Sequence, residues 1–86
     1  MFKHMREHVR ESIFEGERHK ISTDGKAFFL YRRSEDKWEL SDSNSVGKES
    51  YREALKGMKE ILSLDVPEGD KILKICESGL FRVSNL

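Results

Sequence analysis

The stretch Lys26-Ala-Phe-Phe-Leu-Tyr-Arg-Arg33 carries large apolar side chains at successive positions, and turn-forming residues stand on both sides of it. Asp24-Gly25 precedes it, a dipeptide typical of two-residue hairpin turns. Ser34-Glu-Asp-Lys37 follows it, and Trp38 then resumes strand-like residues. We therefore predict a three-stranded antiparallel meander over about residues 17–42, with strands at about 17–23, 26–33 and 37–42.

Side chains alternate between the two faces of a strand, so this pattern divides the meander into two apolar faces. The larger face is predicted to carry Ala27, Phe29, Tyr31, Trp38 and Leu40. The smaller face is predicted to carry Ile21, Phe28, Leu30 and Arg32, with His19, Glu39 and Ser41. A sheet covered on one side only should alternate apolar and polar residues, so we expect both faces to be covered.

Helical patterns flank the meander. Phe2, Met5, Val9 and Ile13 recur at helical spacing over residues 2–14, and Gly16 follows as a terminator. An amphipathic helix is predicted over about residues 50–63, where Ser50-x-x-Glu53 reads as a capping box. We expect this second helix to pack on the larger face. The N-terminal helix, a second copy or a partner protein would then cover the smaller face.

The C-terminal segment allows two interpretations. Pro67 at a helix start, acidic residues in the first turn and Gly79 just past the end favour a short helix over about 67–78, followed by a terminal strand over 80–84. Residues 71–76 and 80–84 also fit a hairpin. We prefer the helix, and the predicted fold class is α+β, in a single domain spanning residues 1–86.

Composition excludes several classes of protein. Apolar residues make up 36% of the chain and charged residues 37%, and the longest apolar run, residues 27–31, is too short to span a membrane. The N-terminus has no apolar core of a secretory signal, and Cys76 is the single cysteine, so we expect a cytoplasmic protein without disulfides. The net charge is zero, which is not typical of a nucleic-acid-binding domain.

These features favour a small, non-enzymatic binding or regulatory module that acts through protein–protein contacts, with a partner protein or as a homodimer. Exposed apolar patches usually mark such contacts. The predicted interface is Ile21, Phe28, Leu30 and Arg32 on the smaller face, beside the basic residues 3–10. No phosphate-cradling glycine loop and no nucleophile elbow is present, so neither an enzyme nor a cofactor is predicted.

Binding of RNA or single-stranded DNA is an alternative that we do not favour. The segment from Gly25 to Arg32 resembles the aromatic strand of RNA-recognition sheets, whose rings stack on bases. That resemblance implies stacking by Tyr31 and Trp38 and phosphate contacts from Lys26, Arg32 and Arg33. The chain departs from the family pattern, because Phe28, Phe29 and Leu30 follow one another where that family has an aromatic, a small and an aromatic residue.

A second alternative is calcium. The twelve residues from Asp42 to Glu53 resemble an EF-hand loop, with Asp42, Asn44, Gly47, Ser50 and Glu53 at the first, third, sixth, ninth and twelfth positions. Val46 stands where that loop needs a side-chain oxygen. The competing interpretation is a polar loop followed by the capping box.

His4 and His8 have zinc-ligand spacing on a helix, without a second ligand pair nearby in the sequence.

Overall fold

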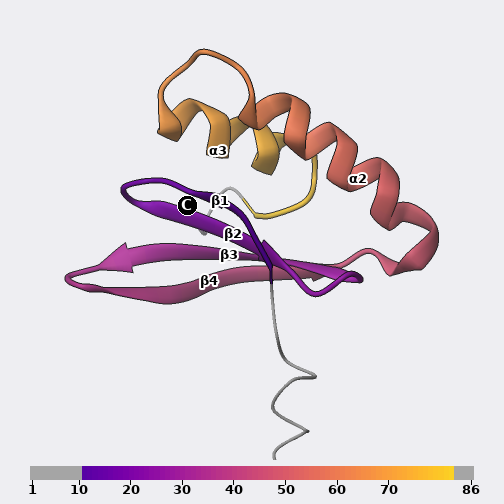
Figure 1. Cartoon of the computed structure of the whole chain (residues 1–86), viewed down its shortest axis with the longest axis horizontal. Helices are drawn as coiled ribbons and strands as arrows, with labels where there is room; N and C mark the ends of the chain where they lie inside the picture. Colours follow the sequence, from indigo (N-terminus) through magenta and orange to yellow (C-terminus); the bar gives the residue numbers. More distant parts are fainter. Residues whose placement is uncertain (1–10, 83–86) are drawn as a thin grey trace, which may run out of the picture.

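The computed structural model describes residues 11–82, which form four strands and two helices. The strands are β1 (Glu11–Glu15), β2 (His19–Thr23), β3 (Ala27–Ser34) and β4 (Lys37–Ser45), and the helices are α2 (Gly47–Leu62) and α3 (Glu68–Glu77). The strands form one antiparallel sheet in the order β1-β2-β3-β4, and both helices lie on the same side of it (Figure 1). The α+β class is confirmed, with four described strands instead of three in the sheet.

Strand β1 corrects the predicted N-terminal helix over its last residues; residues 2–10 of that prediction lie outside the described residues. Residues 11–14 pair with β2, and the register shifts between Ser12 and Phe14. Such a bulge lets two neighbouring side chains point to one face, and both Ile13 and Phe14 pack against the core. The alternation that reveals a strand is therefore missing here, and the apolar spacing fits a helix by coincidence.

The two hairpins differ in their turns. Residues 34–37 close the second hairpin as predicted, with a two-residue turn, and Tyr31 pairs with Leu40 across it. The first hairpin pairs Thr23 with Phe28, so its loop spans four residues and the predicted two-residue turn at Asp24-Gly25 is wrong. The Oδ1 atom of Asp24 accepts hydrogen bonds from the backbone N–H groups of Lys26 and Ala27, at 3.0 and 2.9 Å. These bonds stabilise the wider loop, and a shift of two residues leaves each side chain on its predicted face.

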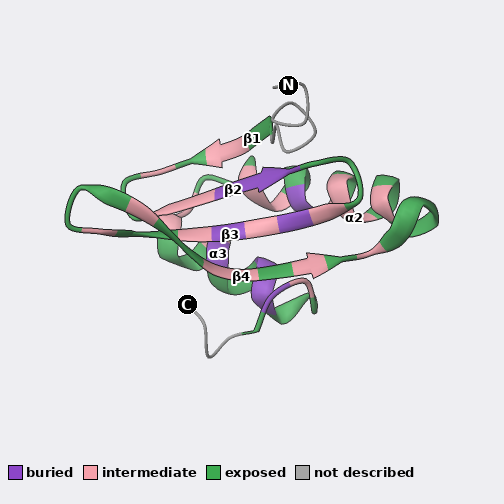
Figure 2. Ribbon diagram, turned by 90° about the horizontal axis from the view of Figure 1, so that it is seen from below, coloured by how far each residue is buried: buried purple, intermediate pink, exposed green. Residues whose placement is uncertain are grey.

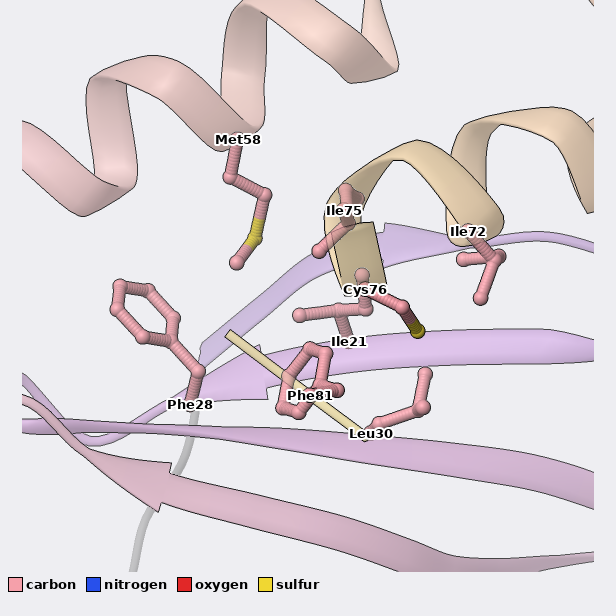
Figure 3. Packing of buried hydrophobic residues seen from close by; sticks show 8 residues of the cluster. All are labelled: Ile21, Phe28, Leu30, Met58, Ile72, Ile75, Cys76 and Phe81. Atoms are coloured by element: carbon pink, nitrogen blue, oxygen red, sulfur yellow. The ribbon is translucent and has the colours of Figure 1, made fainter. Parts of the chain in front are cut away.

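The core lies on the smaller apolar face, so the predicted assignment of the faces to the helices is reversed. Ile21, Phe28 and Leu30 are fully buried beneath α2 and α3 (Figure 3). They pack with Met58, Ile72, Ile75, Cys76 and Phe81. The ring of Phe28 also stacks on that of Tyr51, with 5.1 Å between centroids.

The opposite face carries cations between its rings, which explains the reversal. Lys20 and Arg33 would have to lose their hydration under a layer of helices, and burial of an unpaired charge is costly. The smaller face has no charge at its centre, so the helices bury it instead.

Both helices start and end close to the predicted positions, with two corrections. Helix α2 begins at Gly47, and Val46 at its N-cap makes no side-chain cap, so Ser50 and Glu53 lie inside the helix and form no capping box. Helix α3 follows Pro67 and ends before Gly79, whose φ of +100° is the conformation expected of a glycine after a helix. Residues 80–82 form no strand; residues 83 and 84 of that prediction lie outside the described residues.

Glu68, at the start of α3, fastens the helix layer to the sheet. Its carboxylate accepts hydrogen bonds from the backbone N–H groups of Glu17 and Arg18 and pairs with His19 Nδ1, all at 2.8 to 2.9 Å. A side chain at Gly16 would collide with this carboxylate. Burial by itself raises the pKa of Glu68, but the hydrogen bonds from His19 and from the two backbone groups outweigh it and hold the pKa below its usual value.

Candidate functional site

We call the side of the sheet that faces away from α2 and α3 the open face. Figure 2 views the molecule from that side, and no described helix or loop covers the strands there. The pairings of Lys20 with Tyr31 and of Ser22 with Phe29 place these residues together on it. The pairings of Arg33 with Trp38 and of Tyr31 with Leu40 extend the same face onto β4. This face is the candidate functional site.

A patch of rings and cations occupies one end of the open face. We define the aromatic–cationic patch as Lys20, Phe29, Tyr31, Arg33, Trp38 and Leu40. The guanidinium of Arg33 lies 4.6 Å from the ring centroid of Trp38, and Lys20 Nζ lies 5.5 Å from that of Tyr31 and 5.9 Å from that of Trp38. Cations over ring faces are attracted by the π electrons, so the contacts hold the two charges beside the rings.

The patch is partly exposed, and its two cations form no ion pair with any carboxylate in residues 11–82. Leu40 is 55% exposed, the highest value among the large apolar residues of the described chain. Phe29, Tyr31 and Trp38 are half-buried, and Arg33 is exposed. Apolar groups and unpaired charges thus meet on one surface, which suits contact with a molecule that carries both kinds of group.

Among residues 11–82, acidic residues stand only at the margins of the patch. Glu15 pairs with Lys20 across the first two strands. Glu17 and Glu35 line a hollow together with Arg18 and Arg33 at the end of the sheet. These carboxylates moderate the positive charge without neutralising it by direct contact.

The structure places the predicted interface differently from the sequence pattern. Ile21, Phe28 and Leu30 are fully buried in the core, so in this fold they present no surface to a partner. Arg32 is exposed on the helix side of the sheet, between its pairing partners His19 and Glu39. The basic residues 3–10 lie outside the described residues.

Three of the five residues predicted for nucleic acid come together. Tyr31, Arg33 and Trp38 share the patch, whereas Arg32 lies on the opposite side and Lys26 lies in the loop before β3. Sequence reasoning did not assign Lys20 or Leu40 to any site. Side chains alternate along a strand, so Lys20 must point to the face opposite Ile21. The sequence pattern could therefore have placed Lys20 on the open face.

The residues of the calcium-loop prediction do not form a loop. Strand β4 continues through Ser45 and α2 begins at Gly47, so Asp42 and Asn44 belong to a strand and Ser50 and Glu53 to a helix. Asp42 Oδ2 accepts a hydrogen bond from the N–H of Arg82, and Asn44 donates one to the carbonyl of Leu80. These side chains hold the C-terminal segment beside β4.

The other candidate groups are also placed by the fold. His19 pairs with Glu68, Cys76 is buried, and its burial raises the pKa of the thiol. His4 and His8 lie outside the described residues. A hollow of about 450 Å³ between α2 and residues 78–80 is lined mostly by apolar side chains, and Glu53 is the one ionisable residue described in its lining. No described helix is long and apolar enough to cross a membrane.

Searches with protein-family models, curated proteins and solved structures returned no match for this chain.

Proposed function

We propose that this chain is a non-enzymatic binding module that docks another protein on the open face of its sheet. The observation that carries the proposal is the aromatic–cationic patch, which the helices leave uncovered. Trp, Tyr and Arg are the residues most enriched among those that dominate protein–protein binding energy. Trp38, Tyr31 and Arg33 are neighbours there, beside the exposed side chain of Leu40.

The edges of the sheet favour docking on the face over strand addition at an edge. β1 is five residues long, has a glutamate at each end and contains a bulge. β4 contains a register shift opposite Leu30 and Tyr31, and residues 80 and 82 bond to its side chains. Short length, charges and bulges are devices that discourage a further strand from pairing.

The test compares Leu40→Glu with Leu73→Glu, which adds the same charge at a partly exposed leucine on α3. Affinity purification followed by mass spectrometry, on wild type and both variants, identifies proteins retained by each. We expect a partner that wild type and Leu73→Glu retain and Leu40→Glu loses. Equal retention by wild type and both variants would contradict docking on this face.

Native mass at two protein concentrations tests whether the partner is a second copy. A dimer that forms at the higher concentration and disappears in Leu40→Glu would make the open face a homodimer interface. A monomer at both concentrations leaves a different protein as the partner.

Single-stranded nucleic acid is a second candidate, favoured by the proximity of Tyr31, Trp38 and Arg33 on an uncovered sheet. Stacking on exposed rings beside cations is a common mode of single-strand binding. Trp38 is the only tryptophan in the chain, so its fluorescence reports directly on this face. Quenching by an oligonucleotide that is lost at high salt would support this candidate.

A further inference from the structure

Resting on the proposed function, we infer that the partner presents an acidic, apolar peptide segment, whose carboxylates contact Lys20 and Arg33 while an apolar side chain packs on Leu40. Three features of the patch support this occupant: its charge, the way its cations are held and the position of its exposed leucine.

The cations of the patch are positioned before any partner arrives. Lys20 and Arg33 come from adjacent strands, and both side chains lie against the ring of Trp38, at 5.9 and 4.6 Å from its centroid. Neither forms an ion pair with the carboxylates of residues 11–82. Because these flexible side chains are already held in place, binding a carboxylate costs less side-chain entropy. The patch is therefore preorganised for an anion.

Charge disfavours a second copy of this chain as the occupant. Two open faces packed together would bring two Lys20 and two Arg33 side chains into one interface, with Glu15, Glu17 and Glu35 only at its margins. Like charges brought together at an interface repel each other and disfavour the complex. A partner with carboxylates gains from the same two cations, so complementarity selects an acidic protein segment.

The apolar part of the patch sets the second requirement. Leu40 pairs with Tyr31 across the hairpin and is 55% exposed. Covering such a side chain with another apolar group is favourable in proportion to the apolar area that is removed from water. The segment must therefore combine carboxylates with at least one apolar side chain.

The same features argue against nucleic acid as the main ligand. Two cations would neutralise two phosphates, which corresponds to a salt slope of only about −1.4 for a single strand, at about −0.7 per phosphate. Arg33 already lies over Trp38, so a base would have to displace it to stack on that side of the ring. An apolar side chain gains more from Leu40 than a phosphate does.

The experiment selects binders from a randomised twelve-residue peptide library displayed on phage, with the purified chain as target. The selection is repeated on Lys20→Gln/Arg33→Gln, on Leu40→Ser and on Arg32→Gln. Arg32 is the matched control because it neighbours Arg33 in sequence and lies on the opposite side of the sheet. Circular dichroism checks that each variant is folded.

We expect wild type to select peptides rich in Asp and Glu that also carry Leu, Ile or Phe. Trp38 fluorescence measures the binding of synthetic copies of these peptides. They should bind the Lys20→Gln/Arg33→Gln variant at least tenfold more weakly than wild type. Their affinity for Arg32→Gln should lie within twofold of that for wild type. Replacing Glu by Gln in the peptide should weaken binding to wild type by a similar factor.

Two other outcomes would contradict the inference, and they differ in whether protein docking on the open face survives. Selected peptides that depend on Leu40 but carry no acidic bias would contradict the acidic partner and leave protein docking on the open face intact. If no selected peptide depends on Leu40 or on Lys20 and Arg33, both the inference and the proposed function fail. In that second case, salt-sensitive quenching of Trp38 fluorescence by a twelve-nucleotide oligo(dT) would identify nucleic acid as the ligand of the open face.

Discussion

The two faces of the sheet carry similar numbers of large apolar side chains and have opposite environments. On one face Ile21, Phe28 and Leu30 are completely buried; on the other, Leu40 is 55% exposed and the rings are half-buried. The difference follows from the polar residues that accompany each set. Lys20 and Arg33 keep one face in contact with water, because their charges cannot be buried without partners. Apolar content alone is therefore a poor guide to which face a helix covers.

The adjacent phenylalanines offer the sharpest test of this contrast. Phe28→Ala removes a fully buried ring and should lower the free energy of unfolding by about 3–5 kcal/mol. Phe29→Ala removes a half-buried ring from the open face and should cost about 1–2 kcal/mol. Urea denaturation of the two variants measures both. Equal losses would mean that the open face is covered as thoroughly as the core.

The second prediction concerns the attachment of the helices to the core face. Glu68→Gln keeps the shape of the side chain and removes the charge that three donors share, so the free energy of unfolding should fall by about 2 kcal/mol near neutral pH. A matched control is Glu60→Gln on the exposed side of α2, which should change stability by less than about 0.5 kcal/mol.

The same carboxylate predicts a pH dependence. Because the pKa of Glu68 is lower in the folded chain than in the unfolded one, its contribution is present above the unfolded value and is lost as the pH falls through the folded value. Stability should therefore decline below about pH 4. Asp24, whose pKa is lowered by hydrogen bonds from Lys26 and Ala27, adds to that decline. A flatter acid limb in Glu68→Gln than in wild type, in urea titrations from pH 3 to 7, would confirm the assignment.

Neighbouring hydroxyl groups give the third test. Thr23, on the core face, donates to the Ala27 carbonyl at 2.8 Å and contacts the Tyr51 hydroxyl, so Thr23→Val should cost about 1–2 kcal/mol. Ser22, on the open face, is 2% exposed, and its Oγ has no hydrogen-bond partner among the described residues. Ser22→Ala should be neutral or stabilising by up to about 1 kcal/mol in thermal unfolding. A large loss in Ser22→Ala would show that its hydroxyl is satisfied.

The smallest expected effect lies at the turn that ends the patch. Glu35 has a φ of +59°, which costs a residue with a side chain about 1 kcal/mol and costs glycine little. Glu35→Gly should raise the free energy of unfolding by about 0.5–1 kcal/mol. Asp36, the next residue, does not have a positive φ, so Asp36→Gly should not raise the free energy of unfolding. A gain in Asp36→Gly alone, measured by denaturation, would contradict the argument.

Local chemistry made much of the architecture predictable. The apolar run within residues 26–33, with turn residues on both sides of it, identified the central strand, and residues 34–37 identified the second turn. The alternating direction of side chains along any strand then separated its two faces. Pro67 and Gly79 marked the limits of α3. Each of these signals acts through the backbone geometry or the side-chain direction of a few neighbouring residues, so the surrounding structure had little power to change it.

Long-range contacts determined the rest, because their energies depend on residues far apart in the chain. Pairing with β2 made residues 11–15 a strand despite their helical spacing, and the Asp24 side chain widened the first hairpin. Two helices packed on Ile21, Phe28 and Leu30, and the cost of burying Lys20 and Arg33 left Trp38 and Leu40 accessible. Because the helices bury that face, the candidate binding surface lies on the opposite side of the sheet from the one predicted. Side-chain alternation defines two faces of a sheet, but it does not determine which of them the helices bury.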